Sequence, residues 1–278
     1  MTLCIGWVRK LHQTQEICLI ADSCFSGGQR FYSAPKIFPM TRGDCAIACA
    51  GATVYSFPIV EHIVRALEIN GPIRDRAKDF LDIISLIEDV VNICLSQEKE
   101  KQFESPGFSM IIAGYSWRQK DSRLFQIEYS KKARKMVANR ARTMLGSRIA
   151  FIGDEDIVKK SKSELIRLLQ AEKRESGNNT IDMQPLDILM DKIESKEIST
   201  IGGYPQMVKI YPYMRVLPIG FKSKTDNTIY YFGRPLMKYE TFPFPIYDFE
   251  KRGFVYMKET SETFKREHDE TKELTNFL

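Results

Sequence analysis

The chain has 278 residues, of which 43% are hydrophobic and 28% are charged, a balance typical of a globular protein with a sizeable core. Its net charge of +5 is spread along the sequence and is too small to indicate nucleic-acid binding. No apolar run reaches the roughly 18 residues of a membrane span, and the N-terminus lacks the pattern of a secretory signal. We therefore expect neither a nucleic-acid nor a membrane partner.

The six cysteines lie mostly in apolar stretches, five of them within the first fifty residues, and none forms a C-x-x-C pair. This placement favours buried free thiols in a reducing compartment over disulfides. The three histidines, His12, His62 and His268, are scattered, so the sequence does not predict a zinc site. We expect a cytoplasmic protein that needs no metal and no cofactor.

The first part of the chain predicts strands followed by two helices. Residues 2–8 and 16–21 are short and rich in Ile, Val and Cys, and the polar connection between them predicts a hairpin. A loop with two glycines, an extended segment with two prolines and a small apolar strand at 45–50 follow. Apolar residues at helical spacing then predict helices at 53–67 and at 77–100.

The second part repeats this order. Strands are predicted at 108–115 and 123–129, and the segment MLGSRIAFIG has the composition of another strand. Two amphipathic helices follow at 154–173 and 184–196. Three further strands, IGGYPQMVKIY, RVLPIGF and TIYYFG, precede a tail that is rich in proline and aromatic residues and then becomes charged.

The order of elements indicates the α+β class. Short polar turns between neighbouring strands predict antiparallel sheets, and helices that arrive in pairs must cover sheet faces. The predicted architecture is a four-layer αββα sandwich of two antiparallel sheets. Its strands would be buried on both faces, which fits the continuously apolar runs CLIA and CAIACA. We assign residues 1–220 to this domain and residues 221–278 to a C-terminal extension with an aromatic, proline-rich arm and a charged helix.

Thr2 is a candidate nucleophile because it directly follows Met1. Removal of Met1 would leave Thr2 with a free α-amine beside its hydroxyl, and the pKa of about 8 of this amine allows it to act as the base for that hydroxyl. The chemistry also needs a nearby lysine, which favours the alkoxide by its charge, and a carboxylate that holds the lysine. Backbone N–H groups must face the developing oxyanion.

The sequence offers one candidate for each of these roles. Asp22 ends the second strand, and the predicted hairpin would bring it next to Thr2. Lys36 lies in the extended segment APKIF, and Gly51 ends an apolar strand before a helix, where N–H groups are unpaired. Taken singly, each residue has an ordinary structural explanation: Asp22 would belong to a turn, Lys36 would be a solvated surface charge, and Gly51 would allow a backbone conformation that other residues rarely adopt. Their joint order and spacing indicate the site.

The segments TLCIGWV, ICLIADSCFSGG, APKIF and CAIACAGAT resemble the N-terminal half of proteasome β-subunits and of the bacterial ATP-dependent protease chamber subunit. Both belong to the N-terminal-nucleophile (Ntn) hydrolases. The resemblance implies that Thr2 is the nucleophile, that Asp22 orients Lys36, that Lys36 tunes the nucleophile, and that Gly51 supplies the oxyanion-hole amide. LGSRIAFIG resembles the G-S-G segment of the family, which implies that Ser147 supports the nucleophile.

The predicted function is a threonine amidohydrolase, a peptidase that acts on a peptide or protein substrate. Two alternatives stay open: an Ntn amidase that acts on small acyl amides, and a catalytically inactive proteasome-like structural or scaffold subunit. The resemblance also implies a homo-oligomer, such as a ring. A partner ATPase or regulatory protein follows from analogy alone.

Overall fold

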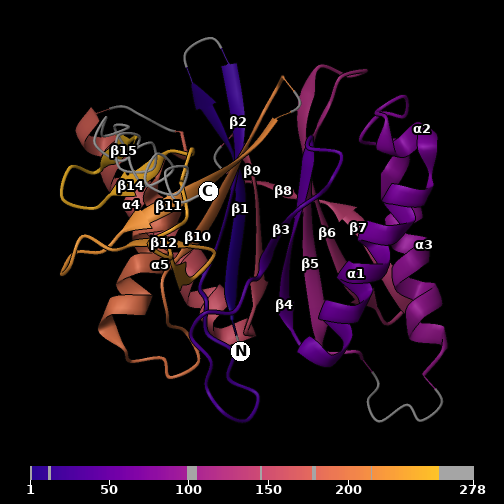
Figure 1. Cartoon of the computed structure of the whole chain (residues 1–278), viewed down its shortest axis with the longest axis horizontal. Helices are drawn as coiled ribbons and strands as arrows, with labels where there is room; N and C mark the ends of the chain where they lie inside the picture. The colour runs from indigo at the N-terminus through magenta and orange to yellow at the C-terminus, as the bar shows by residue number, and fades with distance from the viewer. Residues whose placement is uncertain are drawn as a thin grey trace, which may run out of the picture.

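The computed structural model contains two β-sheets that face each other (Figure 1). It describes residues 2–11, 14–98, 105–144, 146–176, 180–213 and 215–256. The smaller sheet contains, in spatial order, β3 (Ile37–Pro39), β4 (Cys45–Gly51), β5 (Phe108–Ser116), β6 (Asp121–Ser130) and β7 (Lys135–Arg140).

The larger sheet contains, in spatial order, β13 (Arg234–Pro235), β12 (Ile229–Tyr231), β11 (Arg215–Lys222), β10 (Gln206–Tyr211), β2 (Thr14–Ala21), β1 (Leu3–Leu11), β9 (Ser147–Gly153) and β8 (Arg142–Met144). Two further strands lie off this path: β14 (Ile246–Asp248) pairs with β11, and β15 (Gly253–Val255) pairs with β14. Among the described strand pairs, only β11 with β14 is parallel.

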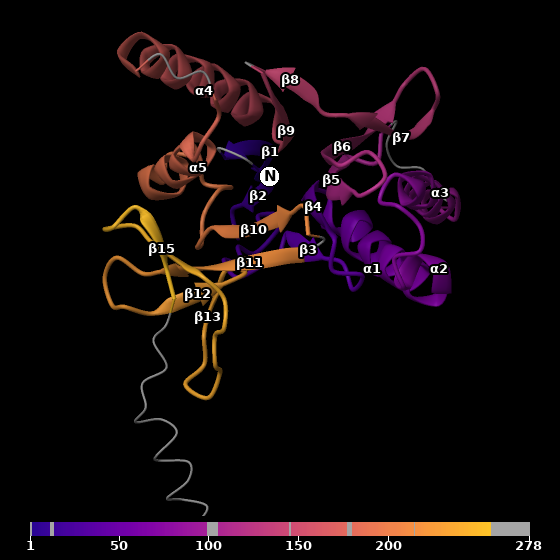
Figure 2. The same ribbon diagram turned by 90° about the horizontal axis from the view of Figure 1, so that it is seen from above.

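Helices cover the outer face of each sheet (Figures 1 and 2). The smaller sheet is covered by α1 (Thr53–Ile69) and α3 (Asp82–Ser96), with the short α2 (Gly71–Arg74) between them in the chain. The larger sheet is covered by α4 (Glu155–Ser176) and α5 (Gln184–Ser195). Each helix pair buries its apolar side chains against its own sheet, which produces two outer cores.

A third core lies between the two sheets and brings the inner faces close together. It is rich in alanines, among them Ala46, Ala48, Ala113 and Ala150. Small side chains allow two sheets to approach closely without voids. Strands β1, β2 and β4 are thus buried on both faces, as their continuously apolar sequences predict.

The structure confirms the main elements of the sequence prediction. The β1–β2 hairpin pairs Cys4 with Ala21 and Leu11 with Thr14. The helix predicted at 77–100 begins only at Asp82, and α2 forms separately before it. Strand β7 was not predicted, because it lies in a segment rich in basic residues. Its Met136 is nevertheless buried in the core, between exposed and half-buried neighbours. The two-sheet, mainly antiparallel arrangement is present.

The predicted domain boundary after residue 220 needs correction, because it falls inside β11. The residues that follow add strands to the larger sheet: Phe221 pairs with Tyr230 of β12 and also with Tyr247 of β14. Phe221 and Tyr247 belong to the outer core under α4 and α5. Strands β12 to β15 are therefore part of the same sheet, and the predicted charged helix lies outside the described residues.

Five of the six cysteines are buried, as predicted, and all six thiols are free in the structure. Over the ranges that the structure describes, the helices are too short or too polar to cross a bilayer.

Candidate active site

The hydroxyl of Thr2 lies beside Asp22 and Lys36, where the β1–β2 hairpin begins and ends. Because Cys4 pairs with Ala21, the hairpin register brings the next residues, Leu3 and Asp22, together. Thr2 Oγ1 donates a hydrogen bond to Asp22 Oδ1 at 3.0 Å. Lys36 Nζ donates to Asp22 Oδ1 at 2.8 Å and also to Thr2 Oγ1. The structure thus brings together three of the predicted residues.

The carboxylate of Asp22 is held from several sides. Its Oδ1 also accepts the backbone N–H of Leu3 at 3.2 Å, and its Oδ2 accepts those of Cys24 at 3.0 Å and Gly202 at 3.3 Å. Asp22 is 0% exposed and Lys36 is 2% exposed. A buried charge is tolerated only when it is paired and hydrogen-bonded, and these contacts meet that condition. The position of the Lys36 ammonium is consequently fixed.

Gln206 of β10 joins the segments that carry Lys36 and Asp22. Its Oε1 accepts the backbone N–H of Lys36 at 2.9 Å. Its Nε2 donates to Ser23 Oγ at 2.8 Å and to the carbonyl of Ala34 at 2.6 Å. Gln206 is fully buried, so each of these bonds is shielded from water. Gln206 was not predicted from the sequence, because it lies 170 positions from Lys36 and only the fold brings the two together.

Gly51 lies at the end of β4, where the chain turns into α1. Its φ of +103° and the 2.2 Å gap that a Cβ would leave to the carbonyl oxygen of Gly107 require glycine here. The N–H of Ala52 donates to the carbonyl of Gly107, the residue before β5, at 3.0 Å. Since successive N–H groups of a strand alternate in direction, the Gly51 N–H faces the opposite side, toward β3 and the Lys36 segment.

A cavity of about 560 Å³ opens in front of these groups and is lined by Thr2, Lys36 and Gly51. Its wall includes three phenylalanines, of which Phe25 and Phe57 pack edge to face with centroids 5.2 Å apart. The Lys36 ammonium lies 5.9 Å from the Phe25 ring centroid. The site therefore offers a hydroxyl, a cation and a candidate oxyanion donor next to a largely apolar space.

Two thiols near this cavity are poor competitors for the role of nucleophile. Cys49 lines the cavity, and Cys4 donates to the carbonyl of Cys49 at 3.3 Å. Burial raises the pKa of both thiols, so they are protonated at neutral pH. The hydroxyl of Thr2 is the group that Lys36 contacts.

The prediction that Ser147 supports the nucleophile is wrong. In the pairing of β1 with β9, Leu3 lies opposite Gly153 and Trp7 opposite Ile149. Ser147 is therefore at the far end of β9, roughly 20 Å from Thr2 by the rise of a strand. Its hydroxyl is buried and has no hydrogen-bond partner among the described residues.

The segment that actually reaches Thr2 from β9 is Gly153-Asp154. The N–H of Asp154 donates to the carbonyl of Thr2 at 3.2 Å. A Cβ on Gly153 would lie 1.9 Å from the same carbonyl oxygen, so only glycine fits. Asp154 Oδ1 accepts the N–H of Asp156 at 3.2 Å, as an N-cap of α4 does. Both Gly153 and Gly51 lie between an apolar strand and a helix. This shared pattern is the sequence signal that could have identified the Gly153-Asp154 segment.

Met1 lies outside the described residues, so its predicted removal is not tested by the structure. The described residues contain no group of three or more His, Cys, Asp or Glu side chains arranged to hold a metal ion.

Comparisons with known proteins place the fold. No protein-family model and no curated protein sequence matches the chain. Among solved structures, it resembles the Anbu (Gly-1) mutant from Hyphomicrobium sp. strain MC1, with a TM-score of 0.53 and 14% sequence identity. The similarity covers 78% of this chain and 84% of the Anbu chain. At this level of identity the likeness concerns the fold alone: the chain shares the overall fold of the Anbu chain.

Proposed function

We propose that the chain is a threonine amidohydrolase that cleaves peptide bonds, with Thr2 as the nucleophile once Met1 has been removed. The observation that carries this proposal is the position of Lys36, whose ammonium donates both to Thr2 Oγ1 and to Asp22 Oδ1. A packing core does not need a buried cation shared between a carboxylate and a hydroxyl that lines a cavity. The proteasome-like fold supports the same class of enzyme.

In the proposed reaction, the α-amine of Thr2 takes the hydroxyl proton and Thr2 Oγ1 attacks the peptide carbonyl carbon. The Lys36 ammonium stabilises the negative charge on Oγ1, and the Gly51 N–H stabilises the tetrahedral oxyanion. The C–N bond then breaks, and the leaving amine takes the proton from the α-ammonium. Water hydrolyses the remaining acyl ester and restores the free hydroxyl.

The aromatic wall of the cavity supports a substrate with an apolar side chain next to the cleaved bond. We further infer that the layers form the αββα sandwich of the Ntn hydrolases. We also infer that the protein assembles as a homo-oligomer, such as a ring. A partner ATPase or regulatory protein is part of the same proposal by analogy. The six free cysteines support a reducing compartment, the cytoplasm.

The test combines intact mass with kinetics. Mass spectrometry of the purified protein is expected to show that Met1 is absent. Hydrolysis of fluorogenic peptides is expected to fall by at least roughly 10³-fold in Thr2→Ala, because the attacking oxygen is gone. Thr2→Ser keeps the hydroxyl and serves as the matched control, with part of the activity retained.

Covalent labelling separates the alternatives. A peptide epoxyketone or boronate should modify the wild type at Thr2 and leave Thr2→Ala unmodified. A folded protein that lacks Met1 yet neither hydrolyses nor reacts would be a scaffold subunit. Hydrolysis of small acyl amides without hydrolysis of peptides would identify an amidase.

A further inference from the structure

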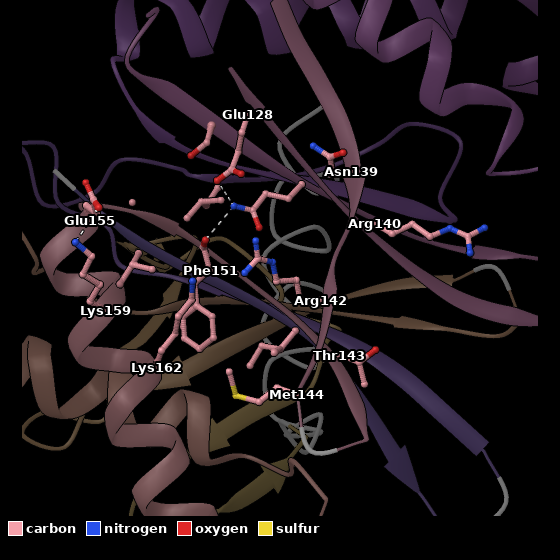
Figure 3. A pocket seen from close by; sticks show the side chains of 16 residues that line it. Glu128, Asn139, Arg140, Arg142, Thr143, Met144, Phe151, Glu155, Lys159 and Lys162 are labelled. Carbon is pink, nitrogen blue, oxygen red and sulfur yellow. Dashed lines mark hydrogen bonds and ion pairs between the residues drawn. The ribbon is translucent and has the colours of Figure 1, made fainter. Parts of the chain in front are cut away.

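A second and larger cavity lies between the free edges of the two sheets and helix α4 (Figure 3). It measures about 730 Å³ and is lined by residues from β5, β6, β7, β8, β9 and α4. A volume of this size is in the range of pockets that hold ligands larger than a single small ion. It shares no lining residue with the cavity in front of Thr2.

Two cations converge in this cavity. Figure 3 shows Arg142 from β8 and Lys162 from α4 directing their charged ends toward the same region beside Phe151. The Lys162 ammonium lies 5.5 Å from the Phe151 ring centroid. Arg140 lines the cavity too, although its guanidinium points away. These three cations make no ion pair with any described residue.

Two acids, Glu128 and Glu155, line the cavity and are outnumbered by its four arginine and lysine residues. Glu155 is paired with Lys159 at 2.8 Å, one helical turn away. Glu128 accepts a hydrogen bond from Gln126, which also donates to the carbonyl of Phe151 at 3.2 Å. The cavity therefore keeps an excess of positive charge, and a ligand that fits it carries negative charge.

The chemistry of the lining favours carboxylates over a nucleotide. A nucleobase needs an open aromatic face for stacking, but Phe151 is only 3% exposed and Lys162 lies over its ring. The fork of an arginine such as Arg142 matches a carboxylate in a bidentate geometry. Asn139 and Thr143 in the same wall provide polar groups that suit a peptide backbone.

We propose that this cavity is a binding site for an acidic peptide segment, held by Arg142 and Lys162. Its near end lies at Gly153, which contacts the carbonyl of Thr2. From Glu155 to Lys162 the rise of α4 is roughly 10 Å, which an extended peptide spans with roughly three residues. A segment bound here lies close to Thr2, but its binding does not require Thr2 to be catalytic.

The test is a direct binding measurement on the Thr2→Ala background, so that hydrolysis cannot interfere. The probe is a rhodamine-labelled tetraglutamate peptide, followed by fluorescence anisotropy, with labelled tetralysine as the charge control. We expect saturable binding of tetraglutamate that weakens as salt rises. Arg142→Ala and Lys162→Ala should each weaken it roughly tenfold, and Arg142→Lys by less.

The matched control is Lys160→Ala, which removes an exposed lysine of α4 that does not line the cavity. It should leave the affinity unchanged, and melting temperatures establish that all the variants fold. Equal weakening by Lys160→Ala would overturn the proposal in favour of diffuse charge attraction. Absence of saturable tetraglutamate binding would overturn it, and so would displacement of the peptide by AMP at lower concentration than by unlabelled tetraglutamate.

Discussion

The two ends of strand β2 each carry a buried acid that is paired with a lysine, and at one of them the lysine also donates to a hydroxyl that lines a cavity. Near the start of β2, Glu16 pairs with Lys209 of β10 at 2.9 Å. Immediately after its end, Asp22 pairs with Lys36 at 2.8 Å. Both acids are buried, at 1% and 0% exposure, and both clusters involve residues of β10.

The partners of the two lysines differ. Glu16 is shared by Lys209 and by Arg9, each at 2.9 Å, and the Phe254 ring covers the Lys209 ammonium at 4.0 Å. The Cys18 thiol also donates to Glu16 Oε1 at 3.7 Å, and the Tyr211 hydroxyl hydrogen-bonds to the same carboxylate. At the other end, the ammonium of Lys36 also donates to a hydroxyl in the wall of a cavity. A buried ion pair by itself is thus a structural feature of the core. An ion pair that also contacts a reactive group in the wall of a cavity indicates a functional site.

The largest effect expected from this comparison is that of Lys36→Met. The substitution keeps an unbranched side chain but removes the charge beside Thr2 Oγ1, so the attacking alkoxide loses its stabilising cation. We expect kcat/KM for peptide hydrolysis to fall by at least roughly 10³-fold, about 4 kcal/mol of barrier. Steady-state kinetics measure it, with circular dichroism to establish that the variant is folded.

Lys209→Met makes the same change at the other end of β2 and is the matched control. It leaves Glu16 with Arg9 as its remaining cation, so we expect a loss of about 3 kcal/mol in the free energy of unfolding. Below its melting temperature the variant should keep the wild-type kcat. A folded Lys209→Met protein without activity, or a Lys36→Met protein with normal activity, would show that the two ends do not differ as proposed.

The sequence could predict those parts of the site that local pattern determines. The hairpin register follows from two apolar runs and a short connection, and it correctly places Asp22 next to Thr2. Lys36 and Gly51 were chosen as the candidates that the chemistry of an N-terminal threonine requires, the family resemblance implied the same roles, and the structure places both at the same cavity.

The remaining features depend on contacts between distant segments. Gln206 bonds to the Lys36 segment only because β10 adds to the edge of β2. Ser147 was chosen for a Gly-Ser pair, but the register of β9 on β1 decides which glycine reaches Thr2, and that one is Gly153. The domain boundary failed for a similar reason, since the pairing of β12 and β14 with β11 is not visible in local composition.

Gln206→Leu tests whether the position of Lys36 is set from β10. The variant fills similar volume but removes the bonds to Lys36 N–H, Ser23 Oγ and the Ala34 carbonyl. A small displacement of Lys36 should lower kcat by roughly 10- to 100-fold and leave KM nearly unchanged. Gln206→Glu retains the acceptor for Lys36 N–H and should keep more of kcat. A purely structural role would lower the melting temperature and leave kcat of the folded protein unchanged.

The smallest expected effect concerns the pH dependence of stability at the Glu16 end. Burial alone would raise the pKa of Glu16, but Lys209 and Arg9 outweigh it and hold the pKa below its ordinary value. A carboxyl whose pKa is lowered by folding stabilises the protein fully above its unfolded pKa of about 4.3 and loses this contribution as pH falls through the folded value.

Chemical denaturation of the wild type and of Glu16→Gln at a series of pH values should therefore give a stability difference that is constant near neutrality. Below a pH of about 4.3 the difference should shrink, by on the order of 1 kcal/mol, because protonated Glu16 resembles the uncharged glutamine. Other carboxyls titrate in both proteins and cancel in the difference. If the two stability curves stay parallel down to the lowest pH, Lys209 and Arg9 do not stabilise the ionised form of Glu16. The Glu16 end would then differ from the Asp22 end in charge as well as in the hydroxyl that its lysine contacts.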